Sequence, residues 1–142
     1  MKISARNQFH GKVVAVTTGA VNAEVRVALS SGQEMVAIVT NESLKSLKLE
    51  PNAAVIALFK ASSVLVMTDD SGVRLSARNS LKGTVTALKK GPIHAEVTIG
   101  LPSGDQVQAS ITLDACDEMG LAVGTGATAV IKAPQVLLGV PA

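Results

Sequence analysis

Residues that could bind a small anion occur twice in the sequence, 72 positions apart. The tetrapeptide Ser4-Ala5-Arg6-Asn7 returns unchanged as Ser76-Ala77-Arg78-Asn79, and Lys60-Ala61 returns as Lys132-Ala133 at the same spacing. Arginine presents a fixed fork of N–H donors, lysine a compact positive charge, and serine a hydroxyl. Backbone N–H groups beside alanine can approach a ligand closely. This pattern is typical of a site that holds an anion through charge-assisted hydrogen bonds.

A structural explanation of the same residues stays open. A lysine at the end of a strand can extend its charged head into solvent, and an exposed arginine can pair with a surface carboxylate. For any one residue this is the better interpretation. The presence of all of them in both copies favours a binding site.

The donor set limits which anion would fit, because it contains no carboxylate. Phosphate at neutral pH is largely monoprotonated, and leaving its O–H without an acceptor costs about 1–3 kcal/mol. Sulfate, molybdate and tungstate are fully deprotonated dianions and avoid this cost. Charge does not separate these three, so the choice among them depends on the size of the pocket.

The two halves of the chain are copies of one another. Residues 1–70 align over residues 73–142 without a gap, with 22 identical pairs among 70. Such a register indicates that both halves share a fold. The polar, turn-forming junction at 68–72 marks the boundary between them. We therefore expect two domains, residues 1–70 and residues 73–142.

Each half is predicted to contain three strands, a short helix and two further strands. Alternating apolar and polar residues, rich in valine, indicate half-buried strands, and Ser-Gly pairs indicate hairpin turns. This order predicts an all-β fold of two tandem OB-like five-stranded Greek-key barrels, each with one short helix. The expected strands of the first half are 11–18, 23–29, 35–40, 54–60 and 63–67. The second half repeats this order, with 95–101, 107–112, 127–132 and 136–140 after a first strand that matches 11–18. The expected helices lie between Thr40 and Pro51 and over 112–121.

The composition argues against several classes of protein. The chain has a net charge of +2, two phenylalanines, and no tyrosine or tryptophan, so it lacks the aromatic platforms and basic groove of nucleic-acid-binding OB folds. Two histidines and one cysteine give no catalytic set, no direct cation ligands and no sign of an organic cofactor. No signal peptide or membrane-spanning run appears. We expect a soluble cytoplasmic protein that is not an enzyme and does not bind membranes.

The combined motif resembles the Mop domain of molbindins. It consists of Ser-Ala-Arg-Asn followed by Gly-x-Val, then Gly-x-x-x-Ala-Glu-Val, and a Lys-Ala pair near the end of a unit of about 70 residues. The chain carries this motif in both halves and so resembles two-repeat molbindins with tandem Mop domains. The resemblance implies a cytoplasmic molybdate-binding protein for the storage or homeostasis of molybdenum, with tungstate as an alternative ligand. A sensory or ligand-delivery oxyanion-binding module that acts on a partner protein is the other function that it allows.

The resemblance also implies a homotrimer with binding sites between domains of neighbouring subunits. In one departure from the symmetry, Pro134 stands where the first copy has Ser62, so the two kinds of site are expected to differ. The residues carried over to these sites are Ser4, Ala5, Arg6, Lys60, Ala61, Ser62, Ser76, Ala77, Arg78, Lys132 and Ala133. A second class of site near the symmetry axis is implied at Val21, Asn22, Ile93 and His94, although His94 could equally be an exposed turn residue.

Overall fold

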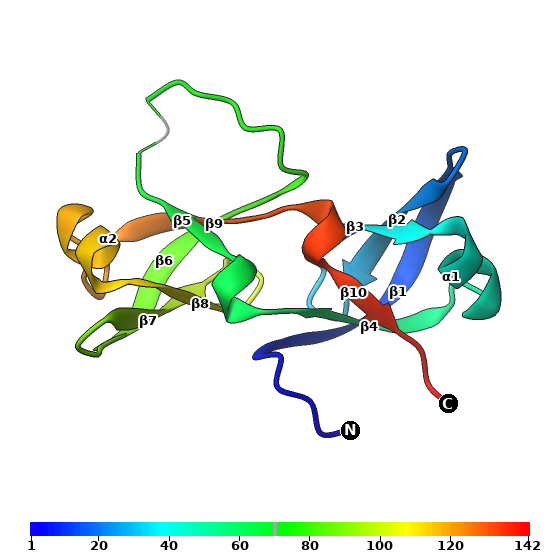
Figure 1. The fold of residues 1–142 in the computed structure, drawn as a ribbon, viewed down its shortest axis with the longest axis horizontal. Helices are drawn as coiled ribbons and strands as arrows, with labels where there is room; N and C mark the ends of the chain where they lie inside the picture. Colours follow the sequence, from blue (N-terminus) through cyan, green and yellow to red (C-terminus); the bar gives the residue numbers. More distant parts are fainter. Residues whose placement is uncertain (70) are drawn as a thin grey trace. The chain divides into compact units, whose positions relative to one another are not determined.

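The protein forms two compact units, each built on a five-stranded antiparallel sheet (Figure 1). The structure, a computed structural model, describes residues 1–69 and 71–142. Unit 1 contains residues 1–59 and 132–142, and unit 2 contains residues 60–131. The all-β class, with five strands and one short helix in each unit, is confirmed. Asp70, in the expected junction at 68–72, lies outside the described residues.

Unit 1 has the strand order β10-β4-β1-β2-β3. Its two edge strands, β10 and β3, contact one another, and a 3-10 turn packs on β3, so the sheet curls toward a barrel. Its elements are β1 (Asn7–Thr18), β2 (Asn22–Leu29), β3 (Glu34–Thr40), α1 (Asn41–Ser46), β4 (Ala54–Phe59), the 3-10 turn η2 (Ala133–Gln135) and β10 (Leu137–Gly139).

Unit 2 repeats this arrangement with the order β5-β9-β6-β7-β8. Its edge strands β5 and β8 also contact one another, and the matching 3-10 turn packs on β8. Its elements are the 3-10 turn η1 (Ala61–Ser63), β5 (Leu65–Met67), β6 (Asn79–Lys90), β7 (His94–Gly100), β8 (Gln106–Thr112), α2 (Leu113–Glu118) and β9 (Gly126–Ile131).

The last strand of each sequence repeat belongs to the sheet of the other repeat. Strand β10 pairs with β4 in unit 1, and β5 pairs with β9 in unit 2. The expected boundaries, 1–70 and 73–142, follow the sequence repeat, whereas the compact units exchange these final segments. Because both copies have the same pattern there, the sequence does not indicate which sheet each final strand joins.

Small and β-branched side chains fill both cores. In β2 and β7 every second residue is buried, which gives the expected inward and outward alternation. The two phenylalanines lie together in unit 1, where Phe9 and Phe59 stack with their ring centroids 5.8 Å apart. Phe59 is fully buried, so the few aromatic side chains serve the core.

The helices start where the sequence predicts but are shorter. The Thr40 side chain accepts a hydrogen bond from the Ser43 backbone N–H at 3.0 Å, and Thr112 caps α2 in the same way through Ala115. Each helix has six residues. The chain then turns through a residue with positive φ, Lys48 at 53° and Gly120 at 61°, which stops the helix before the expected end.

Candidate functional site

The Ser-Ala-Arg segments lie directly before the first strand of each repeat. Strands β1 and β6 begin at Asn7 and Asn79, four residues earlier than the expected start in the first copy. These two asparagines are 1% and 2% exposed. Ser4, Arg6, Ser76 and Arg78 are exposed, and Ala5 and Ala77 are half-buried. The buried asparagine therefore anchors each segment to its sheet while the donor side chains stay accessible.

The Lys-Ala segments follow the strands that pair with β1 and β6. Lys60 comes directly after β4, and Lys132 directly after β9. Both lysines are exposed, whereas Ala61 and Ala133 are buried at the start of the 3-10 turns. Burial in the turn gives these alanines a structural reason to be small, in addition to any role beside a ligand.

In each repeat, the arginine and the lysine lie just beyond the last paired residues of the same two strands. Asn7 pairs with Phe59, and Arg6 and Lys60 are the next residues in the chain beyond this pair. Asn79 pairs with Ile131, beyond which come Arg78 and Lys132.

The two 3-10 turns have the same backbone and different donors. Lys60 has φ −75° and ψ 142°, and Lys132 has φ −68° and ψ 137°. The Ser63 N–H donates to the Lys60 carbonyl at 3.0 Å, and the Gln135 N–H to the Lys132 carbonyl at 2.9 Å. Ser62 is exposed and has a hydroxyl and a backbone N–H, whereas Pro134, also exposed, has neither. The expected difference between the copies is therefore chemical and not conformational.

Three of the four expected near-axis residues line two hollows in matching positions. One hollow, of about 260 Å³, lies beside the turn from β1 to β2 and includes Asn22. The other, of about 400 Å³, lies beside the turn from β6 to β7 and includes Ile93 and His94. Val21 and Ile93, at the turn tips, are 71% and 69% exposed. Sequence reasoning found the turns but not the hollows beneath them.

The hollow of unit 2 carries more basic residues than that of unit 1. Lys89 and Lys90 line it where the first copy has Thr17 and Thr18. The Lys90 Nζ lies 2.8 Å from a carboxylate oxygen of Asp117 in α2. This hydrogen bond, with the charge of the carboxylate, raises the pKa of Lys90 above its ordinary value of 10.5. Lys90 is therefore already paired, and Lys89 and His94 are the other basic side chains that line this hollow.

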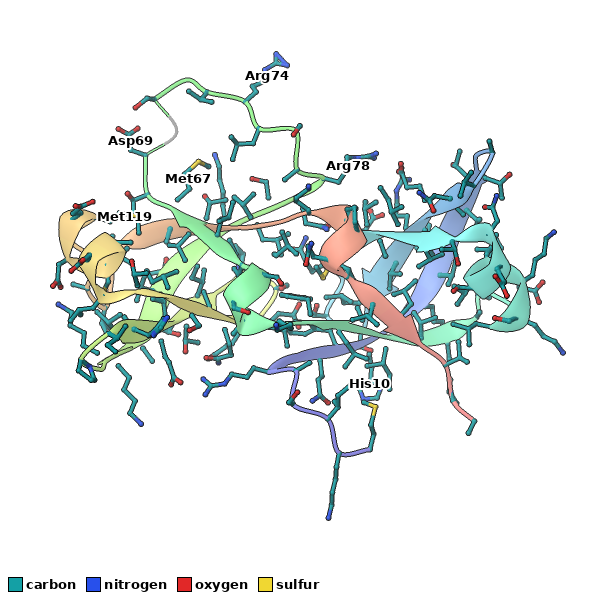
Figure 2. All side chains as sticks on the ribbon, viewed as in Figure 1. His10, Met67, Asp69, Arg74, Arg78 and Met119 are labelled. Carbon is teal, nitrogen blue, oxygen red and sulfur yellow. The ribbon has the colours of Figure 1, made fainter. Side chains whose placement is uncertain are left out.

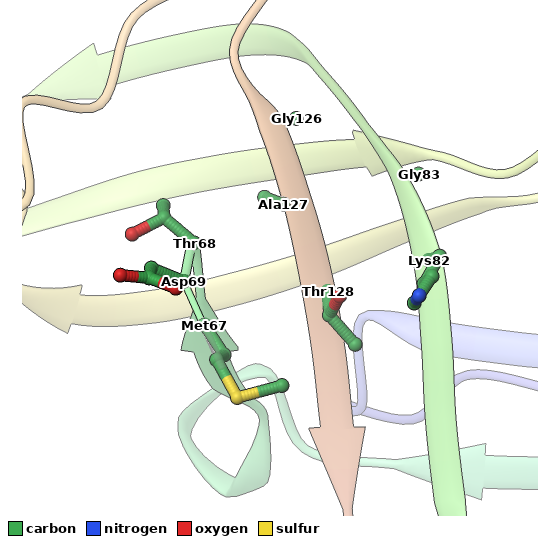
Figure 3. Close-up of a pocket in the computed structure, with 8 residues that line it drawn as sticks. All are labelled: Met67, Thr68, Asp69, Lys82, Gly83, Gly126, Ala127 and Thr128. Atoms are coloured by element: carbon green, nitrogen blue, oxygen red, sulfur yellow. The ribbon is translucent and has the colours of Figure 1, made fainter. Parts of the chain in front are cut away.

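A third hollow, of about 310 Å³, lies among β5, β6 and β9 (Figure 3). In Figure 3 the side chains of Thr68 and Asp69 lie on one side of β9 and that of Lys82 on the other. Asp69 brings a carboxylate to this hollow, as Glu24 and Glu96 do to the two turn hollows, so a carboxylate does not distinguish the three. None of its lining residues was a predicted site residue: they are Met67, Thr68, Asp69, Lys82, Gly83, Gly126, Ala127 and Thr128.

Two arginines extend from the segment between β5 and β6. Figure 2 labels both, Arg74 in the middle of the segment and Arg78 at its end, directly before β6. Both are exposed. Only Arg78 belongs to the repeated Ser-Ala-Arg motif, so Arg74 is a natural control for its function.

The described residues contain no metal-binding cluster and no membrane-spanning helix. Over 1–69 and 71–142, no three His, Cys, Asp or Glu side chains gather in a way that could hold a metal ion. Neither described helix is long and apolar enough to cross a membrane. Cys116 is free and fully buried in α2.

The fold and the repeated motif define the class of protein. The TOBE domain matches the chain twice, over residues 3–66 and 75–138. The chain belongs to the TOBE domain family and carries the domain in tandem. The resemblance to two-repeat molbindins is confirmed, and the matched ranges follow the sequence repeat, not the compact units.

Individual relatives are similar over nearly the whole chain. The cytoplasmic molybdate-binding protein ModG, in a structure with molybdate bound, is 52% identical with a TM-score of 0.96, covering 99% of this chain and 100% of that chain. The molybdenum transport protein ModE of Herbaspirillum seropedicae is 45% identical over 99% of this chain and 52% of its own length. The molybdenum-pterin-binding protein MopA of Rhodobacter capsulatus is 40% identical over 99% of this chain and 53% of its own length. The chain spans about half the length of these curated relatives.

Proposed function

We propose that this chain is a cytoplasmic molybdate-binding protein that stores or buffers molybdenum. The observation that carries the proposal is the similarity to molybdate-bound ModG over both repeats, at 52% identity and a TM-score of 0.96. The exposed Ser-Ala-Arg segments, present in both copies next to buried asparagines, supply the chemistry. ModG is described as cytoplasmic, and we place this chain in the same compartment.

The donor set favours molybdate over the more abundant phosphate. Arg6 and Lys60 in the first copy offer donors only, and no carboxylate accompanies them and Ser62. A monoprotonated phosphate would lack a carboxylate partner for its O–H, and leaving that group unpaired costs about 1–3 kcal/mol. Molybdate carries two charges and no proton at neutral pH, so every oxygen can accept. Tungstate has the same charge and shape and is a second ligand of the same site.

The sites are completed between subunits of a homotrimer. In this proposal the Ser-Ala-Arg segment of one subunit meets a Lys-Ala segment of a neighbour. Exposed apolar side chains at matching positions in both copies support self-association, because an isolated subunit would leave them in water. These pairs are Ile3 and Leu75, Val21 and Ile93, and Leu65 and Leu137.

Equilibrium dialysis against molybdate, with the mass of the oligomer measured on the same sample, tests this function. The proposal expects saturable binding and a mass three times that of the chain. Absence of binding at millimolar molybdate would contradict it. The alternative of a sensory or ligand-delivery module is less favoured, because ModG is described as a binding protein.

A further inference from the structure

The turn from β1 to β2 and the turn from β6 to β7 have the same backbone geometry. The Gly19 N–H donates to the Asn22 carbonyl at 2.8 Å, and the Gly91 N–H donates to the His94 carbonyl at 2.8 Å. A Cβ on either glycine would lie about 3 Å from that carbonyl oxygen, at 3.0 and 3.1 Å. Because glycine has no Cβ, both turns can form this short hydrogen bond without a close contact. Both turns border the hollows of their units.

A backbone bond from the first helix residue supports each turn in the same way. The Asn41 N–H donates to the Val21 carbonyl at 2.9 Å, and the Leu113 N–H donates to the Ile93 carbonyl at 2.8 Å. The first copy adds a side-chain bond that Leu113 of the second copy cannot make. Asn41 Nδ2 donates to the Gly19 carbonyl at 2.9 Å, and so Asn41 holds two carbonyls of a four-residue turn.

Asn41 makes this bond at a cost. Its Oδ1 atom is buried without a hydrogen-bond partner, an arrangement that disfavours the folded state. The second copy has leucine at this position and avoids the cost. Packing therefore does not require an amide here, and the bond from Nδ2 to the turn is the evident reason for one.

In the second copy a different residue restricts the turn. Pro92 stands where the first copy has Ala20, at the position of a turn that proline favours because its ring fixes φ. Proline there restricts the unfolded and open forms of the turn. The two copies therefore differ at two positions near this turn: the first copy has Ala20 and Asn41, and the second has Pro92 and Leu113.

We infer that Asn41 is a positioning residue, which restricts the turn at 19–22 through a side-chain hydrogen bond. Pro92 restricts the matching turn at 91–94 through its ring. The inference rests on the proposed function in one respect, since it takes molybdate to bind also at the near-axis residues of these turns, which the resemblance to molbindins implies. Asn41 acts through the turn and not by touching ligand.

Exchanging these residues between the two copies tests the inference. In the first copy the variants are Asn41→Leu, Ala20→Pro and the two together, which give it the residues of the second copy. In the second copy they are Pro92→Ala, Leu113→Asn and the two together, which make the reverse exchange. The first readout is amide hydrogen exchange at Gly19 and Gly91 without ligand. We expect Asn41→Leu to speed exchange at Gly19 about fivefold, the effect of losing one hydrogen bond, while Gly91 stays unchanged. Ala20→Pro should restore slow exchange in the double variant.

The second readout is molybdate affinity by dialysis for the same variants. Asn41→Leu should weaken a subset of sites, and Ala20→Pro should restore them, a rescue that a purely structural role in α1 would not give. The inference is overturned if Asn41→Leu leaves Gly19 exchange unchanged, or if Ala20→Pro fails to rescue both readouts while the unaltered chain binds molybdate. Lack of binding by the unaltered chain would instead overturn the proposed function, and the exchange data would still report on the turn.

Discussion

Leu137 of β10 pairs with Leu58 of β4, although the two residues belong to different sequence repeats. The reciprocal pairing of Leu65 with Val130 joins β5 to β9 in unit 2. Each sheet is therefore completed by the last strand of the other repeat. Neither repeat contains all five strands of one sheet, so the duplication is part of the fold of both units.

Cleavage of the chain between the repeats should leave the pieces associated. A protease site inserted at Gly72, an exposed position with positive φ, would separate residues 1–72 from residues 73–142. Because each piece supplies one strand to the sheet of the other, we expect the pieces to elute together in size-exclusion chromatography. Separate elution of two folded pieces would contradict the strand exchange.

Two adjacent leucines of β10 provide a matched control for this experiment. Leu138 is 8% exposed and Leu137 is 62% exposed. Leu138→Lys would bury an ammonium group without a partner, which disfavours docking of the strand, and should release the cleaved pieces. Leu137→Lys should not.

We expect that Gly83 does not tolerate a side chain and that Gly126 tolerates one. A Cβ at Gly83 would lie 2.3 Å from the backbone carbonyl oxygen of Gly100 on the neighbouring strand, and nothing lies within 4 Å of a Cβ at Gly126. We expect Gly83→Ala to lower the free energy of unfolding by about 1–3 kcal/mol, as overpacking does. Gly126→Ala should change it by much less. Urea denaturation of both variants measures the difference, and equal losses would show that the close approach is not what requires glycine at 83.

Arg78→Ala should remove a subset of molybdate sites without unfolding the protein. The side chain is exposed and precedes a strand that its buried neighbour Asn79 anchors, so the sheet should stay intact. Arg74→Ala, in the same segment but outside the motif, is the control and should retain every site. Dialysis gives the number of sites and thermal melting without ligand gives the stability. Loss of folding in Arg78→Ala would support the structural explanation of this arginine.

Exchanging Ser62 and Pro134 should exchange the properties of the two kinds of site. Ser62→Pro removes a hydroxyl and a backbone N–H, and hydrogen bonds to charged groups are worth about 1.5–3 kcal/mol each. We expect the affinity of the affected sites to fall roughly tenfold or more in Ser62→Pro. Pro134→Ser should raise the affinity of the other sites. Calorimetric titration of both variants measures this, and unchanged isotherms would place Ser62 away from the ligand.

Much of the fold could be predicted from the sequence, because alternation, turn residues and caps are local signals. Helices α1 and α2 lie inside their predicted segments, and the strands for which bounds were predicted lie within a few residues of those bounds. The exchange of β5 and β10 could not be predicted. Their pattern is the same in both copies, and each fits either sheet.

The candidate site could be predicted only in part, for a similar reason. The repeated serine, arginine and lysine residues stand out, because core packing does not explain them. The contribution of Asn41 was missed, because an asparagine at the start of a helix looks like an ordinary capping residue. Its bond to the Gly19 carbonyl joins positions 22 residues apart, and only the folded chain shows it. The hollow among β5, β6 and β9 likewise has no local signal.

Thermal melting in the presence of molybdate, sulfate or phosphate is a direct test of whether this chain binds molybdate. A ligand that binds only the folded state raises the melting temperature in proportion to the logarithm of its excess. We expect the largest increase with molybdate, a weak increase with sulfate, which is a smaller ion, and the least with phosphate, which carries a proton. A melting curve that does not move in a large excess of molybdate, or that moves as far with phosphate, would contradict this expectation.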